Sequence, residues 1–407
     1  MTKSNGAVEI TLDDIRAARV VGAGIVEHTP VTPSAYLSEI SGGKIVLKAE
    51  NLQRTGSFKI RGALNKVTLL GAAAGNGVVA GSAGNHAQAL ALAARQLGVP
   101  CEIFVPKGAS LSKIAACRSY GATVLEGGDN VETAVAMARV RSDEAKMGFC
   151  HPFDDVDVVA GQGTLGLELL EDIDDLEQVI VPLGGGGLLS GVAIALKLQK
   201  PNIRVIGVQV SSCAPYIYGQ MPAGPVLTLA DGIAVKHPGE ITKPLIGKWV
   251  DDVVEVDEDS VADAMMLLLE RAKLYVEGAG AVGVSALLAE RVIPSKTGTT
   301  CIVLSGGNVD LGLIPNLVRR NETKAGRRLI VFVRIADRPG GLARLLTIFA
   351  DLGANLIEVQ HVREGLDLHV RETGVQVALE IRGLDHAEVL LAAAKADGYD
   401  VTAITGQ

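Results

Sequence analysis

The sequence predicts a large open α/β region followed by a small α+β unit of the ferredoxin-like kind. Val- and Ile-rich runs alternate with Ala- and Leu-rich stretches of helical length, the pattern of parallel strands joined by crossover helices. Glycine makes up 48 of the 407 residues, about 12% against a usual value near 7%, while aromatic residues make up only 3%. A polar, basic segment (RRNETKAGRR, 319–328) separates the two regions, and the periodicity changes after it. We therefore expect two folded regions joined by a linker.

The strands expected in the larger region are short apolar runs, and the helices fill the intervals between them. The expected strands are 44–48, 77–80, 101–105, 122–125, 178–181, 204–209, 252–256 and 300–304. The expected helices are 58–73, 84–97, 110–120, 130–147, 161–170, 188–198, 259–274 and 279–290.

The smaller region, 329–407, has the order β-α-β-β-α-β. Its expected elements are strand 329–335, helix 341–352, strand 355–363, strand 374–382, helix 385–396 and strand 399–404. The turn from Asp337 to Gly341 opens the first of these helices. Taken alone, this turn is consistent with a plain glycine turn or with an anion-binding helix start.

Composition excludes several classes of protein. Lys and Arg number 38 and Asp and Glu 46, giving a net charge of −8, and no basic cluster is interleaved with aromatics, so nucleic acid is not an expected partner. The five cysteines lack CxxC spacing, which argues against a disulfide framework and a zinc site and indicates a reducing cytoplasm. No targeting peptide is visible in 1–19. The uncharged run 179–196 is long enough to suggest a transmembrane helix as an alternative. Pro182 and four consecutive glycines instead favour a buried strand, a loop and a helix, so no membrane partner is expected.

Lys59, in the segment Ser57-Phe58-Lys59, stands just after a predicted turn, at a helix start. The helix macrodipole disfavours a positive charge there, which lowers the pKa of a lysine and makes its amine a better Schiff-base nucleophile. An average lysine at such a position would simply be a solvated surface residue.

Two glycine-associated segments follow strands and open helices. The loop Ser82-Ala83-Gly84-Asn85-His86 offers backbone N–H groups to a carboxylate and Asn85 adds a neutral donor, while His86 is expected to be structural and not catalytic. The run Gly184-Gly185-Gly186-Gly187-Leu188 lets several N–H groups converge on one phosphate. Because it matches neither GxGxxG followed by an acid nor GxxxxGK[ST], it indicates neither a dinucleotide nor a nucleoside triphosphate.

The fourth segment, Ser305-Gly306-Gly307-Asn308, follows the strand 300–304. It places a hydroxyl at the carboxyl end of a strand, where ligands of open α/β sheets bind. A simple hairpin-like turn is the alternative interpretation of this segment.

In their order and joint presence, the SFK, SAGNHAQ, GGGGL and SGGN segments resemble pyridoxal-phosphate (PLP) enzymes of fold type II, the tryptophan synthase β-subunit type, and among these the threonine ammonia-lyases, also called threonine dehydratases. The resemblance covers 12–317 and includes His28-Thr29-Pro30. The tail resembles an ACT domain, an amino-acid-sensing module. The resemblance implies two open α/β lobes in 1–320, with a small lobe of about 49–157 nested in the large one, a linker at 321–328 and an ACT-like regulatory domain at 329–407.

Site roles follow from the resemblance, residue by residue. Lys59 would be the catalytic lysine that forms the Schiff base with pyridoxal 5'-phosphate, with Phe58 beside the ring. Asn85 would bond the ring hydroxyl, and Ser305 would face the pyridine nitrogen. The segment Gly184 to Leu188 would hold the phosphate, and Ser82, Ala83, Gly84, Asn85 and His86 would receive the substrate carboxylate.

The implied reaction is the deamination of L-threonine to 2-oxobutanoate and ammonia, as in isoleucine biosynthesis, with L-serine as a secondary substrate and an amino acid as effector. The freed Lys59 amine would remove the α-proton. A serine dehydratase, a serine racemase, or an amino-acid-binding regulator without catalysis are the alternatives. A homo-oligomer, with a tetramer favoured, in the cytoplasm is expected.

Three positions refine this expectation. Ala83 replaces the serine that racemases of this fold place before Gly-Asn, so one face lacks its proton donor. Gln209 stands where those racemases carry a glutamate that binds a divalent metal, so no divalent metal site is expected, while a monovalent cation held by backbone carbonyls stays an alternative. Glu277 aligns loosely with an acid near the cofactor and is a candidate to act from behind the residues that touch it.

Overall fold

The computed structural model describes residues 9–221, 224–363 and 369–404. The chain divides into two compact units, Met1–Asp310 and Leu311–Gln407, which we call unit 1 and unit 2. Residues 1–8 of the N-terminal segment examined for a targeting peptide lie outside the described ranges.

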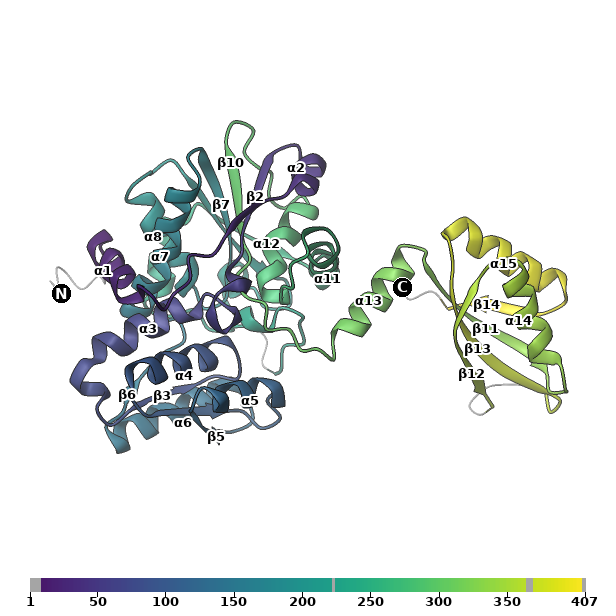
Figure 1. Cartoon of the computed structure of the whole chain (residues 1–407), viewed down its shortest axis with the longest axis horizontal. Helices are drawn as coiled ribbons and strands as arrows, with labels where there is room; N and C mark the ends of the chain where they lie inside the picture. The colour runs from purple at the N-terminus through teal and green to yellow at the C-terminus, as the bar shows by residue number, and fades with distance from the viewer. Residues whose placement is uncertain (1–8, 222–223, 364–368, 405–407) are drawn as a thin grey trace. The chain divides into compact units, whose positions relative to one another are not determined.

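Unit 1 contains a six-stranded sheet in the order β1-β2-β10-β7-β8-β9, parallel except for the pairing of β1 with β2 (Figure 1). The strands are β1 (Val31–Pro33), β2 (Lys44–Lys48), β7 (Leu176–Pro182), β8 (Arg204–Val210), β9 (Asp252–Val256) and β10 (Thr299–Val303). The associated helices are α1 (Leu12–Gly22), α2 (Ala35–Ser41), α7 (Val156–Asp172), α8 (Gly187–Lys197), α9 (Pro215–Tyr218), α10 (Thr242–Trp249), α11 (Glu258–Leu267) and α12 (Gly278–Leu288).

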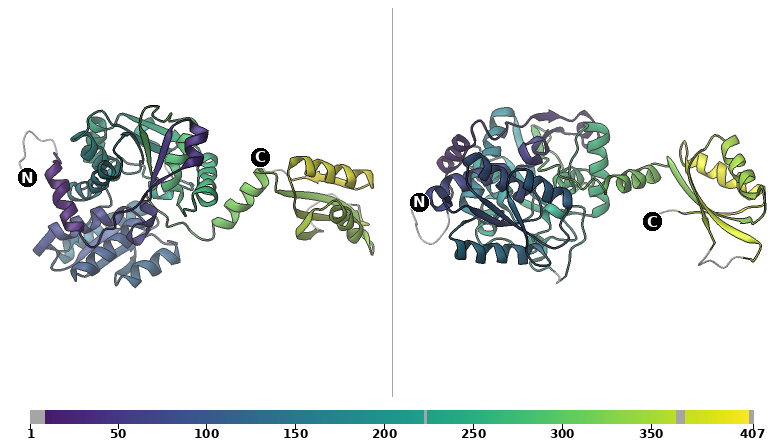
Figure 2. Two further views of the ribbon diagram at one scale, coloured as in Figure 1. Left: turned by 45° about the horizontal axis from the view of Figure 1, so that its top comes forward. Right: turned by 60° about the horizontal axis from the view of Figure 1, so that its bottom comes forward.

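A second, four-stranded parallel sheet, in the order β5-β4-β3-β6, forms a smaller lobe of unit 1. Its strands are β3 (Val78–Gly81), β4 (Cys101–Val105), β5 (Thr123–Glu126) and β6 (Gly148–Phe149). Its helices are α3 (Lys59–Leu70), α4 (Asn85–Leu97), α5 (Leu111–Ser119) and α6 (Val131–Ala145). This lobe lies against the larger one in both views of Figure 2. Each lobe has its own apolar core, around Ile103 in the smaller and Val181 in the larger, as expected for sheets covered by helices.

The predicted fold class is confirmed. The structure differs from the prediction in the ends of some elements and in elements that were not predicted, among them α1, α2, α10, β1 and β6. The helix predicted at 161–170 begins at Val156, because the Asp155 carboxylate accepts the N–H groups of Asp157 and Val158 (2.9 and 3.2 Å) and caps it there. The helix predicted at 259–274 ends as an α-helix at Leu267 and continues as a π turn, Leu268–Ala272. No helix among the described residues has the length and hydropathy that crossing a membrane requires.

Unit 2 has the predicted β-α-β-β-α-β order, with both helices on one face of an antiparallel sheet ordered β12-β13-β11-β14. The helix α13 (Ile314–Lys324) precedes it, so the polar segment expected to be a linker at 321–328 lies in unit 2 and begins inside this helix, whose buried residue is Leu317. The remaining elements are β11 (Arg328–Ala336), α14 (Gly341–Asp351), β12 (Asn355–Val362), β13 (Glu372–Glu380), α15 (Leu384–Ala396) and β14 (Asp400–Ala403).

Candidate active site

The predicted segments of unit 1 meet at the carboxyl ends of its strands, where open α/β sheets bind ligands. The backbone N–H of Phe58 donates to the Ser305 carbonyl (3.1 Å), so the lysine segment is fastened to the segment after β10. The Asn308 side-chain amide donates to Asn85 Oδ1 (2.7 Å), so the segment after β3 joins the same cluster. Ser305 is buried there.

Lys59 is the first residue of α3, as predicted, and a backbone carbonyl holds its amine. Nζ donates to the Pro152 oxygen (2.7 Å) and lies 5.1 Å from the centroid of the Phe58 ring. Burial lowers the pKa of Lys59 to about 8, and the charge of Glu277 offsets only part of this. A far larger share of this amine is therefore neutral at physiological pH than in a solvated lysine.

The glycine run after β7 is a tight loop at the start of α8, and it leaves no room for side chains. A Cβ on Gly185 would lie 2.2 Å from the Phe153 ring, and a Cβ on Gly184 would lie 2.9 Å from the Cα of Ile233. Gly186 has φ +93° and no side chain caps the helix that follows it, so the N–H groups of its first turn remain available to an anion.

Asn85 is held at both ends of its side-chain amide. Its Nδ2 donates to Glu277 Oε1 (2.6 Å), while its Oδ1 accepts from Asn308. Burial, together with the nearby Asp231 carboxylate, raises the pKa of Glu277 to about 7. Glu277 thus helps to orient the Asn85 side chain. The second N–H of the Asn85 amide remains available to donate to a ligand.

A hydrogen bond between a side chain and the backbone stabilises the loop before α4. The Gly84 N–H donates to Ser82 Oγ (3.3 Å), and Ala83 lies between them. His86 is buried, its Nε2 is 3.0 Å from the Cys150 carbonyl, and burial together with the Lys59 charge lowers its pKa to about 3. A histidine that stays neutral in this way suits the structural role expected for it.

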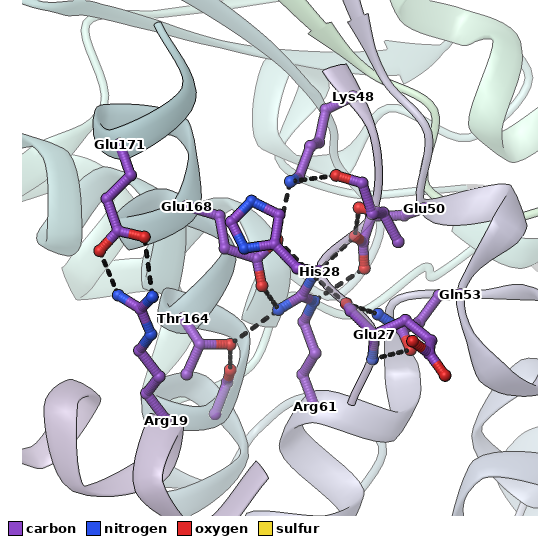
Figure 3. Close-up of polar contacts among 12 residues, drawn as sticks. Arg19, Glu27, His28, Lys48, Glu50, Gln53, Arg61, Thr164, Glu168 and Glu171 are labelled. Carbon is purple, nitrogen blue, oxygen red and sulfur yellow. Dashed lines mark hydrogen bonds and ion pairs between the residues drawn. The ribbon is translucent and has the colours of Figure 1, made fainter. Parts of the chain in front are cut away.

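Two residues after Lys59 in the sequence, Arg61 connects α3 to α7 of the larger lobe through buried charges (Figure 3). The Arg61 guanidinium forms two hydrogen bonds to the Glu50 carboxylate (both 2.8 Å) and two to that of Glu168 (2.6 and 2.9 Å). Lys48 Nζ lies 2.7 Å from Glu168 Oε2 and 3.2 Å from Asp172 Oδ2. These four residues (Lys48, Glu50, Arg61 and Glu168) are all buried, and we call them the ion network.

Residues of the segment 152–154 also belong to the site, and the sequence reasoning missed them. Pro152 binds the Lys59 amine, Phe153 lies on the glycine run, and Asp154 accepts hydrogen bonds from the start of α10. Their only sequence signal is a Pro followed by acidic residues between β6 and α7, which is typical of an ordinary polar turn.

The side chain of Gln209, the residue on which the expectation about a divalent metal rests, forms hydrogen bonds within the protein. Its Oε1 accepts from the Tyr216 N–H (3.0 Å) and its Nε2 donates to the Leu183 carbonyl (3.4 Å). The described residues contain no group of three or more His, Cys, Asp or Glu side chains arranged to hold a metal ion. The absence of a divalent metal remains a prediction.

In unit 2, the turn at 337–341 leads into α14 through Gly340, which has φ +87°. Asp337 pairs with Arg363 (2.8 Å), and the Asn355 amide donates to Glu380 (3.0 Å). The helix start itself has no side-chain cap.

Comparisons with known proteins identify the families that the two regions match. Residues 23–306 match the family model of pyridoxal-phosphate dependent enzymes, and residues 329–393 match that of the ACT domain. The L-threonine ammonia-lyase of Thermotoga maritima is 44% identical over 96% of this chain and 99% of its own length. Among solved structures, maize serine racemase has a TM-score of 0.72 at 35% identity, covering 77% of this chain and 98% of that chain.

The processed form of threonine deaminase isoform 2 from Solanum lycopersicum has a TM-score of 0.70 at 32% identity, covering 75% of this chain and 86% of that chain. The two family models together match most of the sequence, in the order that unit 1 and unit 2 follow. The chain therefore belongs to the family of pyridoxal-phosphate dependent enzymes of fold type II and carries an ACT domain after its catalytic region.

Proposed function

We propose that this protein is a threonine ammonia-lyase that converts L-threonine to 2-oxobutanoate and ammonia, with L-serine as a secondary substrate. The observation that carries the proposal is the position of the Lys59 amine, which donates to the Pro152 carbonyl (2.7 Å) and lies 5.1 Å from the centroid of the Phe58 ring. Burial lowers the pKa of this amine to about 8. The relatives named threonine ammonia-lyase and threonine deaminase support the choice of substrate.

The residues around Lys59 fit the cofactor. The glycine run presents bare backbone at an uncapped helix start, which suits a phosphate monoester. One turn into α8, the buried Ser190 hydroxyl has no hydrogen-bond partner in the part of the chain described. We assign the phosphate to Gly184 through Leu188, the ring to Phe58 and Asn85, and the pyridine nitrogen to Ser305.

When bound, pyridoxal phosphate withdraws electrons from the substrate carbon that loses its proton. The neutral Lys59 amine acts as the base that takes this α-proton, and the Pro152 carbonyl orients it. The loop from Ser82 to His86 orients the substrate by its carboxylate, with the N–H groups at the start of α4. The α-proton and the β-hydroxyl together amount to the loss of one water, which leaves an enamine. Its imine tautomer takes up one water and gives the keto acid and ammonia.

A substrate series tests the proposal. We expect kcat/KM for ammonia release to be highest with L-threonine, lower with L-serine, and negligible with D-serine. One methyl group is worth about 1–3 kcal/mol, so the two L-substrates should differ by roughly 10- to 200-fold. Preference for L-serine would instead identify a serine dehydratase, and absence of turnover with all three would leave only an amino-acid-binding function.

The lowered pKa of Lys59 predicts its reactivity after removal of the cofactor. The neutral amine is the nucleophile, so trinitrobenzenesulfonate should label Lys59 with a rate that rises with pH and reaches half its maximum near pH 8. Peptide mapping by mass spectrometry across a pH series measures this rate. A profile centred near 10.5, the ordinary value for lysine, would contradict the burial argument.

Ala83 predicts that racemisation is a minor reaction, because a methyl group cannot return a proton to the face opposite Lys59. Ala83→Ser should raise the ratio of D-serine formation to ammonia release, and Ala83→Gly serves as the control that changes the side chain without adding a hydroxyl. Chiral chromatography of serine incubations measures the ratio. Racemisation by the unaltered protein as fast as deamination would contradict the prediction.

We propose that unit 2 binds an amino-acid effector at the turn 337–341, because the N–H groups at the uncapped start of α14 suit an α-carboxylate. Isoleucine or valine should change the apparent threonine affinity by about 5–150-fold, the usual range of allosteric coupling. Truncation after Asp310 should leave turnover in place and abolish this response. A full-length enzyme that responds to none of the twenty amino acids would contradict the sensing role.

We further propose a homo-oligomer, with a tetramer favoured, that works in the cytoplasm. The five cysteines are free and buried, which is compatible with a reducing compartment. Light scattering on the purified protein measures the oligomeric state directly.

A further inference from the structure

The segment 152–154 lies between the Lys59 amine and the glycine run. Pro152 accepts from Lys59 Nζ (2.7 Å) on one side. On the other side, the Phe153 ring occupies the space of a Gly185 side chain, and the Phe153 carbonyl lies 3.0 Å from the Cβ position of Gly187. Asp154 follows directly and reaches a third element, α10.

The Asp154 carboxylate caps α10 from a distant part of the chain. Oδ1 accepts the N–H groups of Ile241 and Thr242 (2.9 and 3.1 Å), and Oδ2 accepts that of Glu240 (3.0 Å). The residue preceding the helix, Ile241, supplies no side-chain cap. A Cβ on Gly239 would lie 2.1 Å from Asp154 Oδ1, so glycine is needed there to admit the carboxylate.

Thr242, the first residue of α10, connects the capped start of this helix to the glycine run. It is fully buried, and its hydroxyl donates to the Gly185 carbonyl (2.7 Å). Its Cβ and the Ile246 side chain lie 3.0 and 2.7 Å from the Cβ position of Gly186. The position of the first turn of α10 therefore determines where the Gly185 peptide can lie.

Two helix starts, those of α8 and α10, thus meet at the glycine run. Each offers N–H groups and the positive end of a helix dipole. Asp154 fills the start of α10 with a negative side chain, whereas no side chain caps α8. Of these two helix starts, that of α8 is therefore the one open to an incoming anion.

We propose that Asp154 is a positioning residue for the cofactor phosphate: it fixes the first turn of α10, and Thr242 on that turn fixes the Gly185 peptide so that the N–H groups of the glycine run converge at the start of α8. The inference rests on the proposed function, because it takes the glycine run as the phosphate site. Asp154 and Thr242 touch neither the substrate nor the reacting atoms in this assignment.

The test compares pyridoxal phosphate with pyridoxal, which lacks the phosphate, as ligands of the cofactor-free protein. Equilibrium dissociation constants are measured for Asp154→Ala, Asp154→Asn, Thr242→Val and Thr242→Ser. We expect Asp154→Ala and Thr242→Val to weaken binding of pyridoxal phosphate by about 5- to 30-fold, the factor expected for losing one buried cap, and to leave pyridoxal binding unchanged.

The conservative variants sharpen the test. Asp154→Asn keeps an oxygen for Ile241 and Thr242 and should give an intermediate affinity, while Thr242→Ser keeps the hydroxyl and should bind as the unaltered protein does. Asp257→Ala is the matched control, because Asp257 caps α11 through the Ser260 N–H (2.7 Å), and its hydrogen bonds within the described ranges do not reach the glycine run. It should leave both ligands unaffected.

Equal weakening of pyridoxal phosphate and pyridoxal would overturn the proposal, since it would indicate a general structural defect. Unchanged affinities in Thr242→Val would overturn it as well, and this variant decides the matter if Asp154→Ala does not fold. An unaltered protein that binds no pyridoxal phosphate would refute the cofactor assignment itself, a failure distinguishable from that of Asp154 alone.

Discussion

Lys59→Ala is expected to lower the rate of 2-oxobutanoate formation from L-threonine by at least about 10²–10⁴-fold, the usual contribution of a general base. The variant removes the amine that burial keeps partly neutral and that Pro152 orients. Lys59→Arg should be equally impaired, because a guanidinium stays protonated and cannot accept the α-proton. Steady-state assays at saturating threonine measure the loss.

Lys107→Ala is the control for this prediction, since Lys107 is an exposed lysine of the same lobe, paired only with Asp129 (3.4 Å) among the contacts described. It should retain the activity of the unaltered protein. Added small primary amines should restore part of the activity of Lys59→Ala but not of Lys59→Arg, whose side chain fills the space. Near-native turnover in Lys59→Ala would show that another group removes the proton.

Arg61→Met is expected to lower the free energy of unfolding of unit 1 by about 3–5 kcal/mol, because removing one partner of a buried ion pair leaves the others uncompensated. In the ion network, the guanidinium is bound to both Glu50 and Glu168, and all three are buried. Denaturant titration followed by the fluorescence of Trp249, the single tryptophan, reports on unit 1.

Arg19→Met is the matched control, because Arg19 forms a two-point pair with Glu171 at the surface (Figure 3). The two side chains are 44% and 48% exposed, so this pair should contribute less than about 1 kcal/mol. Equal losses for Arg19→Met and Arg61→Met would contradict the role of burial.

The ion network also predicts that the free energy of unfolding of unit 1 falls at acid pH. Burial by itself would raise the pKa of Glu50, but the Arg61 guanidinium outweighs it and holds that pKa below its ordinary value. A carboxyl with a lowered pKa contributes stability above its unfolded-state pKa and loses it as the pH falls through the folded-state pKa. The difference in stability between the unaltered protein and Arg61→Met should therefore shrink in acid.

Strands and long helices could be predicted because local pattern decides them. The strands 44–48, 101–105 and 252–256 were predicted with the limits that the structure has, since each is a short apolar run bounded by polar or turn residues. The structure adds elements that local pattern does not mark. The strand β6 has only two residues, and α10 contains a proline in its first turn and has its cap supplied from Asp154.

The local backbone of the candidate site could be predicted from the sequence: Lys59 lies at the start of α3, and Gly184 through Gly187 form the loop that leads into α8. The roles of these residues stay predictions. Contacts between distant residues could not be predicted. Arg61 stands in the lysine segment, yet nothing in one sequence indicates that its partners are Glu50 and Glu168. Glu277 was predicted only as a residue behind the cofactor contacts, and its hydrogen bond to Asn85 comes from the fold.

The most direct test of the account is a time course of the purified, cofactor-loaded protein with L-threonine alone, in which 2-oxobutanoate, ammonia and remaining threonine are all quantified. We expect 2-oxobutanoate and ammonia to appear in equal amounts that match the threonine consumed, and the remaining threonine to keep its configuration. Threonine that is epimerised or left intact while no ammonia appears would contradict it.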